Sequence, residues 1–386
     1  AVPDSSMVIR PLADLAGLGS AMPTARMHRE EFFAKLAPLD EERLKKALWN
    51  LYWRGSAAMR ARVEAEIDPG ERQRRQHLEK EPVDPHWVLG EVREFVGLAR
   101  SGAYIGGDRR IARGERTRWR FTFRRLVSDA QSALQAQDVA PAVAAVEALI
   151  DLACETREYD YFRSQDPLEA AQVVVSEVVA VLWGKVRDQY GFAEFAHRVA
   201  PQLIRWESKY GWTRSGWDGV SVKETSLASV LAQMLRVTDM WVVFADCYFD
   251  ALDQVARDDG LKPKQPWRRT CRERKERAAN LAEWHLLLID RLMGSEAEDR
   301  LDRLVSHPAL GGPELTFLRA RLARERGDLV SARDLVHESL QTLPGHPRFL
   351  DFATEIGAPL PPRAQQAKRS LVVNEGRFEV ASPGSG

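Results

Sequence analysis

Apolar residues recur along most of this chain at intervals of three and four, the spacing that places them on one face of an α-helix. No run alternates apolar and polar residues as a half-buried strand does. The segments with helical spacing are 86–100, 115–135, 140–158, 167–189, 192–210, 224–235, 240–258 and 268–293. This pattern predicts an all-α fold, with successive helices antiparallel and stacked as a solenoid or an irregular helical array.

The N-terminal part of the sequence divides into three segments. Residues 1–27 contain glycine and proline without periodicity and are predicted to be flexible. Residues 28–67 are predicted to be helical, in pieces that separate at Pro38, with Asp40 as the cap of the second piece. Residues 68–85 are polar and contain proline, which indicates a solvated linker before the central helical array of residues 86–293.

Helical spacing also runs through residues 313–347, on both sides of an interruption at Gly327. The segment resembles one tetratricopeptide repeat, with Ala320 and Ala332 as the small contacts between two helices, Gly327 as the turn and Pro344 as the terminator. A His-Pro pair occurs at 307–308 and again at 346–347, which suggests a neighbouring repeat boundary. Residues 294–360 are therefore predicted to be repeats of this type, followed by a flexible tail over 361–386.

The overall composition points to no particular partner. The chain has 56 basic and 56 acidic residues and no formal net charge, so attraction to nucleic acid or membrane requires a local patch. Cys154, Cys247 and Cys271 lie far apart, as expected of reduced thiols rather than a disulfide framework or a paired zinc site. The thiols and the short apolar windows predict a cytoplasmic protein without a membrane partner. Frequent arginine and alanine are typical of bacterial genomes rich in GC.

The strongest local charge lies between residues 100 and 125, where nine arginines stand against Asp108 and Glu115, a balance of +7. The stretch starts in a glycine-containing loop, where arginines can grip a phosphate in forked geometry. Four later arginines follow at intervals of three and four, which predicts a ridge on one helix. The candidate binding residues are Arg109, Arg110, Arg113, Arg116, Arg120 and Arg124.

Such a ridge has two functional interpretations and one structural one. Guanidinium groups bind carboxylates and phosphates bidentately, so the ridge suits an acidic protein or a nucleic acid. Alternatively, the ridge pairs internally with an acidic row on the next predicted helix. That row consists of Glu147, Asp151, Glu155 and Glu158.

Residues 205–219 interleave aromatic and basic side chains. Trp212 and Trp217 are candidates for stacking on bases or sugar rings. Aromatic residues that follow the end of a helix more often anchor the loop in the core. Structural anchoring is therefore the favoured interpretation, and base stacking is the alternative.

No catalytic, metal or nucleotide-binding motif occurs in the sequence, and no cofactor or metal is predicted. His285 lies on an apolar helix, where a hydrogen-bonded core histidine is favoured over a general base. The sequence therefore predicts a non-catalytic helical-repeat scaffold that binds another protein, with an acidic partner on the arginine ridge. The alternatives are a nucleic-acid-binding protein that uses residues 100–125 and an enzyme with a site between helices.

Overall fold

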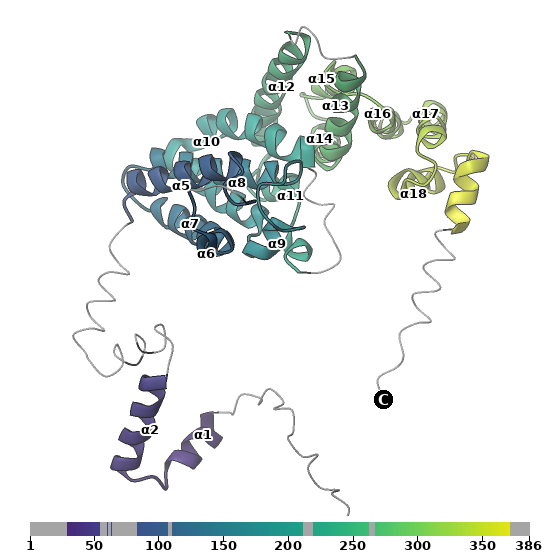
Figure 1. Ribbon diagram of the computed structural model, residues 1–386. Helices are drawn as coiled ribbons and strands as arrows, with labels where there is room; N and C mark the ends of the chain where they lie inside the picture. Colours follow the sequence, from purple (N-terminus) through teal and green to yellow (C-terminus); the bar gives the residue numbers. More distant parts are fainter. Residues whose placement is uncertain are drawn as a thin grey trace, which may run out of the picture. The chain divides into compact units, whose positions relative to one another are not determined.

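A computed structural model describes residues 29–54, 60, 63, 83–106, 110–210, 219–261 and 267–370 of the chain. The chain divides into two compact units, Ala1–Glu81 and Pro82–Gly386, which are considered separately. Every regular element in these described ranges is a helix, so the protein is all-α, as the sequence predicts (Figure 1). Within the same ranges, no helix has the length and apolar character needed to cross a membrane.

The first unit contains α1 (Arg29–Leu36) and α2 (Glu41–Arg54), which confirms the predicted separation at Pro38. The Asp40 carboxylate accepts a hydrogen bond from the Arg43 backbone N–H at 2.8 Å, so the predicted cap is also confirmed. α2 contains no buried residue, and Trp49 and Trp53 stack with ring centres 5.8 Å apart while remaining 57% and 70% exposed. The two rings are four residues apart in sequence, so the helix places them next to each other.

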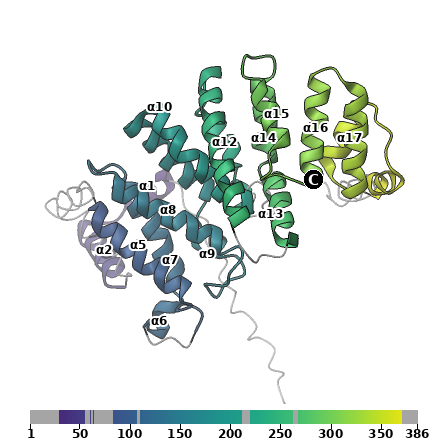
Figure 2. The same cartoon turned by 90° about the horizontal axis from the view of Figure 1, so that it is seen from above.

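Five helices begin the second unit. They are α5 (Pro85–Arg100), α6 (Arg113–Arg116), α7 (Trp119–Ala133), α8 (Ala140–Glu155) and α9 (Pro167–Ala171). α5, α7 and α8 pack against one another (Figures 1 and 2). Phe162 lies at the centre of this packing, stacked on Trp119 at 4.2 Å and in contact with Phe95 and Phe123.

The next helices follow one another along the unit, as Figure 2 shows. They are α10 (Val175–Tyr210), the 3₁₀ turn η1 (Ser221–Lys223), α11 (Leu227–Ala232), α12 (Thr238–Leu261), α13 (Trp267–Asn280), α14 (Ala282–Leu292) and α15 (Asp299–Ser306). α10 packs against α8, α12 and α13 and so joins the earlier helices to the later ones. Its helical geometry breaks at Gly191, with φ +76°, which confirms the boundary predicted between residues 189 and 192.

Two other predicted helices are divided in the structure. The helix predicted over 167–189 is interrupted after Ala171, where Gln172 adopts a left-handed conformation with φ +56°. The carboxylate of Glu224 accepts hydrogen bonds from the backbone N–H groups of Val175 and Ser176, and so starts α10 from a distant part of the chain. The helix predicted over 268–293 is divided at Leu281, whose side chain is buried in the core.

The C-terminal helices are α16 (Pro313–Glu325), α17 (Leu329–Thr342) and α18 (Pro347–Glu355). α16 and α17 pack as a hairpin whose turn contains Gly327, and Ala320 and Ala332 are fully buried. These residues belong to a second buried cluster that extends to Ala364. Residues 362–370 are helical as well, so part of the segment predicted as a flexible tail is ordered by the burial of Ala364.

Gly327 provides a direct test of this turn. Its φ of +82° is accessible to glycine but costs other residues about 1 kcal/mol or more, although a Cβ there meets no neighbouring atom. We expect Gly327→Ala to lower the free energy of unfolding by about 1 kcal/mol in urea titrations. The matched control is Gly184→Ala, inside α10 and also in open space, which is expected to be neutral or stabilising. Equal effects of the two changes would contradict the strain argument.

Candidate functional site

The candidate arginines lie on two helices rather than one. Arg113 and Arg116 are on α6, whereas Arg120 and Arg124 are one turn apart on α7. The helix predicted over 115–135 is interrupted because Trp119 turns inward, where it is 4% exposed and stacks on Phe162. The prediction of a single ridge on one helix is therefore wrong.

Three of the candidate arginines are held by short-range hydrogen bonds. Arg124 donates from Nε to the carbonyl of Ala171 at 2.8 Å and so links α7 to the end of α9. Arg116 donates to the carbonyl of Ile111 at 3.3 Å, and Arg110 donates to the Ser101 hydroxyl at 3.0 Å. Arg109, Trp212 and Trp217 lie outside the described residues, so their predicted roles stay predictions.

The acidic row on α8 binds other partners than these arginines. Glu155 accepts two hydrogen bonds from Arg100, at 2.9 and 2.7 Å. Asp151 accepts from Trp206 Nε1 at 2.7 Å and pairs with Arg205 at 3.1 Å. Glu147 accepts from the amide of Gln202 at 2.7 Å. These three carboxylates therefore stabilise the packing of α5 and α10 on α8 and do not neutralise α6 or α7.

Two other arginines of the same stretch, Arg100 and Arg125, form ion pairs. Arg125, next to Arg124 in sequence, contacts Glu91 at 2.9 Å and Asp129 at 2.8 Å. Across the described parts of the chain, by contrast, no ion pair is formed by Arg113, Arg118, Arg120 or Arg124.

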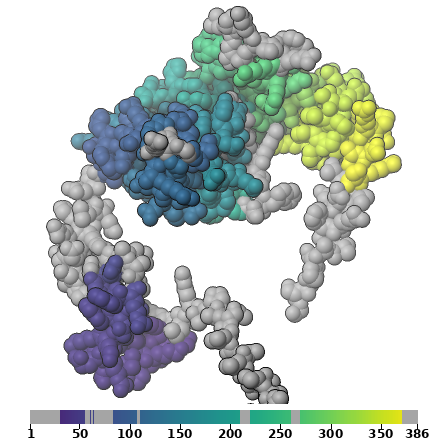
Figure 3. Space-filling model, viewed as in Figure 1, coloured from purple at the N-terminus to yellow at the C-terminus, as the bar shows by residue number. Residues whose placement is uncertain are grey.

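An exposed aromatic ring accompanies these side chains. The Arg120 guanidinium lies 4.9 Å from the ring centre of Phe121, which is 55% exposed. We call Arg113, Arg118, Arg120, Arg124 and Phe121 the arginine patch. It lies on the short helix α6 and the first turns of α7, in the part of the second unit coloured blue in Figure 3. Guanidinium groups beside an apolar ring suit a ligand that has both carboxylates and apolar groups.

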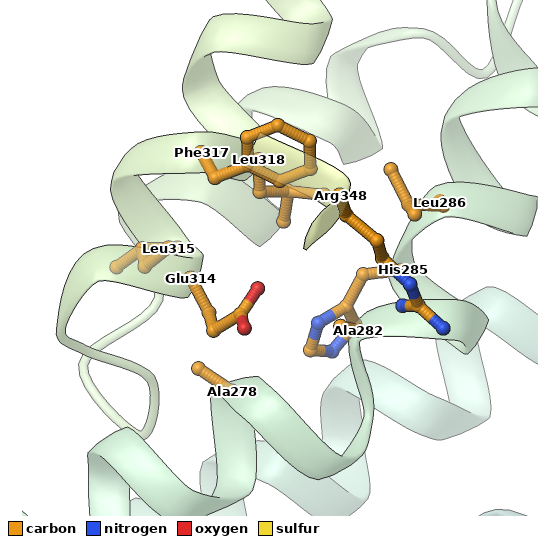
Figure 4. A pocket seen from close by; sticks show the side chains of 9 residues that line it. All are labelled: Ala278, Ala282, His285, Leu286, Glu314, Leu315, Phe317, Leu318 and Arg348. Atoms are coloured by element: carbon orange, nitrogen blue, oxygen red, sulfur yellow. The ribbon is translucent and has the colours of Figure 1, made fainter. Parts of the chain in front are cut away.

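The other candidate from the sequence, His285, lies in the core. Its Nε2 is 2.8 Å from the Tyr248 hydroxyl, and burial, with a smaller effect of His307, lowers the pKa of His285 to about 3. Figure 4 shows His285, Glu314 and Arg348 around a small cavity of about 10 Å³, about the size of a single water molecule. The favoured interpretation as a hydrogen-bonded core histidine is confirmed.

Within the described ranges, no group of three or more histidine, cysteine, aspartate or glutamate side chains is arranged to hold a metal ion. Cys154 is buried, and burial raises the pKa of its thiol well above the ordinary value. Comparison of the chain with models of known families, with curated proteins and with solved structures finds no match.

Proposed function

We propose that this protein is a non-catalytic helical scaffold that binds an acidic segment of another protein through the arginine patch. The observation that carries the proposal is the absence of ion pairs at Arg113, Arg118, Arg120 and Arg124 within the described residues, whereas Arg100 and Arg125 of the same stretch are paired. A partner carboxylate that reaches these groups breaks no internal ion pair, so none of its binding energy is spent on separating one.

The geometry of α7 suits a helical or extended acidic segment. Arg120 and Arg124 are four residues apart, so both guanidinium groups lie on one side of the helix. Arginine binds carboxylates bidentately, and Phe121 adds an apolar contact beside the charges. The resemblance of residues 313–347 to a repeat used for protein interactions supports a scaffold role.

Two observations favour a protein over a nucleic acid as the partner. The chain has no net charge, and the patch has four arginines without ion pairs in the described residues. Nucleic-acid-binding proteins typically neutralise about six to ten phosphates, through a larger basic surface. An acidic peptide requires fewer charge contacts than a nucleic acid, so the number of arginines in the patch suits a peptide better.

The proposal is tested with a variant in which Arg113, Arg118 and Arg120 are replaced by glutamine. Arg124 is retained because its bond to Ala171 supports the packing of α9. We expect the variant to bind a fluorescein-labelled helical peptide of glutamate and leucine about tenfold more weakly, as measured by fluorescence anisotropy at low salt. The loss corresponds to three exposed charge contacts of about 0.5 kcal/mol each.

The control variant loses the same number of positive charges at other places on the surface. Arg236, Arg363 and Arg369 are exposed, and their replacement by glutamine is expected to change binding less than twofold. Indistinguishable affinities of the two triple variants would overturn the proposal. If the patch variant instead loses steeply salt-dependent binding to a labelled single-stranded oligonucleotide, while peptide binding is unchanged, the patch binds nucleic acid.

A further inference from the structure

A groove of about 1160 Å³ lies in the second unit between α8, α10, α12 and α13, away from the arginine patch. α10 packs against each of the other three helices. Ile204 and Trp206 of α10 and Ala251 and Val255 of α12 contribute apolar atoms to its lining. None of its described lining residues belongs to α6 or α7.

Negative charge predominates among the described residues that line this groove. Eight carboxylates face four arginines, which leaves a net charge of −4. Each arginine already binds a carboxylate of the same lining. The pairs are Arg205 with Asp151 at 3.1 Å, Arg269 with Glu273 at 3.2 Å, Arg272 with Glu276 at 2.6 Å and Arg277 with Asp259 at 3.3 Å. The positive charges of the lining are thus committed. Arg100, which lies outside the lining, also binds Glu155, so the acidic character that a ligand can use is assigned to Asp250 and Asp258.

Two carboxylates of the lining that are not paired with any of its four arginines lie on α12. Asp250 and Asp258 are exposed and lie two turns apart, with Gln254 between them. Asp258 accepts a hydrogen bond from the Gln254 amide at 2.9 Å. The Arg303 guanidinium is 3.9 Å from Asp250, but its shorter contact, at 2.7 Å, is with Asp253. These two carboxylates are therefore available to a cation from outside.

We infer that this groove binds an amphipathic segment of a partner protein that is rich in lysine or arginine. Cationic side chains of the segment pair with Asp250 and Asp258, about 12 Å apart along α12, a distance spanned by two turns of a helical ligand. Apolar side chains on the same face of the segment contact Ala251 and Val255, which are only partly buried. The inference goes beyond the proposed function because it concerns another surface and a partner of opposite charge.

The test measures binding of a fluorescein-labelled amphipathic helix of lysine and leucine to the full chain by fluorescence anisotropy. We expect saturable binding that the double change Asp250→Asn with Asp258→Asn weakens five- to tenfold. Neither carboxylate supports a close ion pair, so thermal unfolding is expected to stay unchanged. Ala251→Arg, which introduces a bulky cation between the two carboxylates, is expected to weaken binding at least as much.

Matched controls distinguish binding in the groove from nonspecific attraction between opposite charges. Asp290→Asn with Asp351→Asn removes two exposed carboxylates of α14 and α18, and it is expected to leave the affinity unchanged. The inference is overturned if the two double variants bind alike, if the native chain fails to bind the amphipathic helix, or if oligolysine of equal charge binds as tightly. It is also overturned if sedimentation shows self-association that only the groove variant loses, since the occupant is then a second copy.

Discussion

Replacing Arg277 with alanine is expected to lower the free energy of unfolding by about 3–5 kcal/mol. The Arg277 side chain is 9% exposed and that of Asp259 is 3% exposed, and their charged groups lie 3.3 Å apart. Arg277 also donates a hydrogen bond to the carbonyl of Ala309 at 2.7 Å, which ties α13 to the chain before α16. Removal of the guanidinium leaves a carboxylate in a poorly solvated position and a buried carbonyl without this donor.

Urea-induced unfolding followed by circular dichroism checks this expectation. The control is Arg269→Ala on the same helix, because Arg269 forms a comparable pair with Glu273 but its side chain is 65% exposed. That change is expected to cost less than about 1 kcal/mol. The combined change Arg277→Met with Asp259→Asn should recover much of the stability, since it removes both charges together. If Arg277→Ala is no more destabilising than the control, the pair does not contribute as described.

Local sequence signals determined much of the helical pattern. Apolar spacing identified the helices, and the interruptions at Pro38, between residues 189 and 192 and at Gly327 were predicted correctly. Proline restricts the local backbone, whereas glycine permits the left-handed conformation found at Gly191 and Gly327. The breaks that sequence did not reveal depend on distant contacts. Gln172 takes a left-handed conformation next to a helix start that Glu224 caps from 48 residues away, and Leu281 is held by the core.

The two candidate surfaces were also only partly predictable from the sequence. The sequence located a concentration of arginines, since charge density is a local property, and these include the arginines of the patch that lack ion pairs. The sequence alone does not identify the partner of each arginine. Glu155, for example, contacts Arg100 only when α5 and α8 pack together in the folded chain. The acidic groove was not predicted at all, because its carboxylates come from three helices separated in sequence and become one surface only in the folded chain.

Stability is expected to decrease as pH falls from 7 to 5, and His285 is expected to be a main cause. Burial, with a smaller effect of His307, lowers the pKa of His285 to about 3, against about 6.5 in an unfolded chain. Between these values the unfolded chain takes up a proton that the folded chain excludes, so the stabilisation present above pH 6.5 is lost progressively toward pH 3. At 1.36 kcal/mol per pH unit, His285 alone removes about 2 kcal/mol between pH 7 and pH 5.

Neighbouring groups modify this dependence in known directions. Burial also lowers the pKa of His307, although its contact with Asp253 at 3.0 Å opposes the shift, so His307 adds to the loss at lower pH. Burial raises the pKa of Glu147, although Arg205 opposes the shift, so this carboxyl favours the folded state as the solution becomes more acidic. A comparison of variants that differ only at residue 285 leaves both effects in place and isolates the contribution of His285.

Urea titrations of the native chain and of His285→Gln at pH 7, 6 and 5 provide that comparison. Glutamine retains a group that can hydrogen-bond to the Tyr248 hydroxyl but does not titrate, so the variant is expected to lose about 2 kcal/mol less than the native chain over this range. His197→Gln, which changes an exposed histidine of α10, is the control and is expected to retain the native pH dependence. If the stability of His285→Gln changes with pH as much as that of the native chain, exclusion of a proton from the buried pair of Tyr248 and His285 is not the cause of the loss of stability in acid. A reduced dependence would assign the acid sensitivity of the second unit to the packing of α12 against α14, the two helices that bring Tyr248 and His285 together.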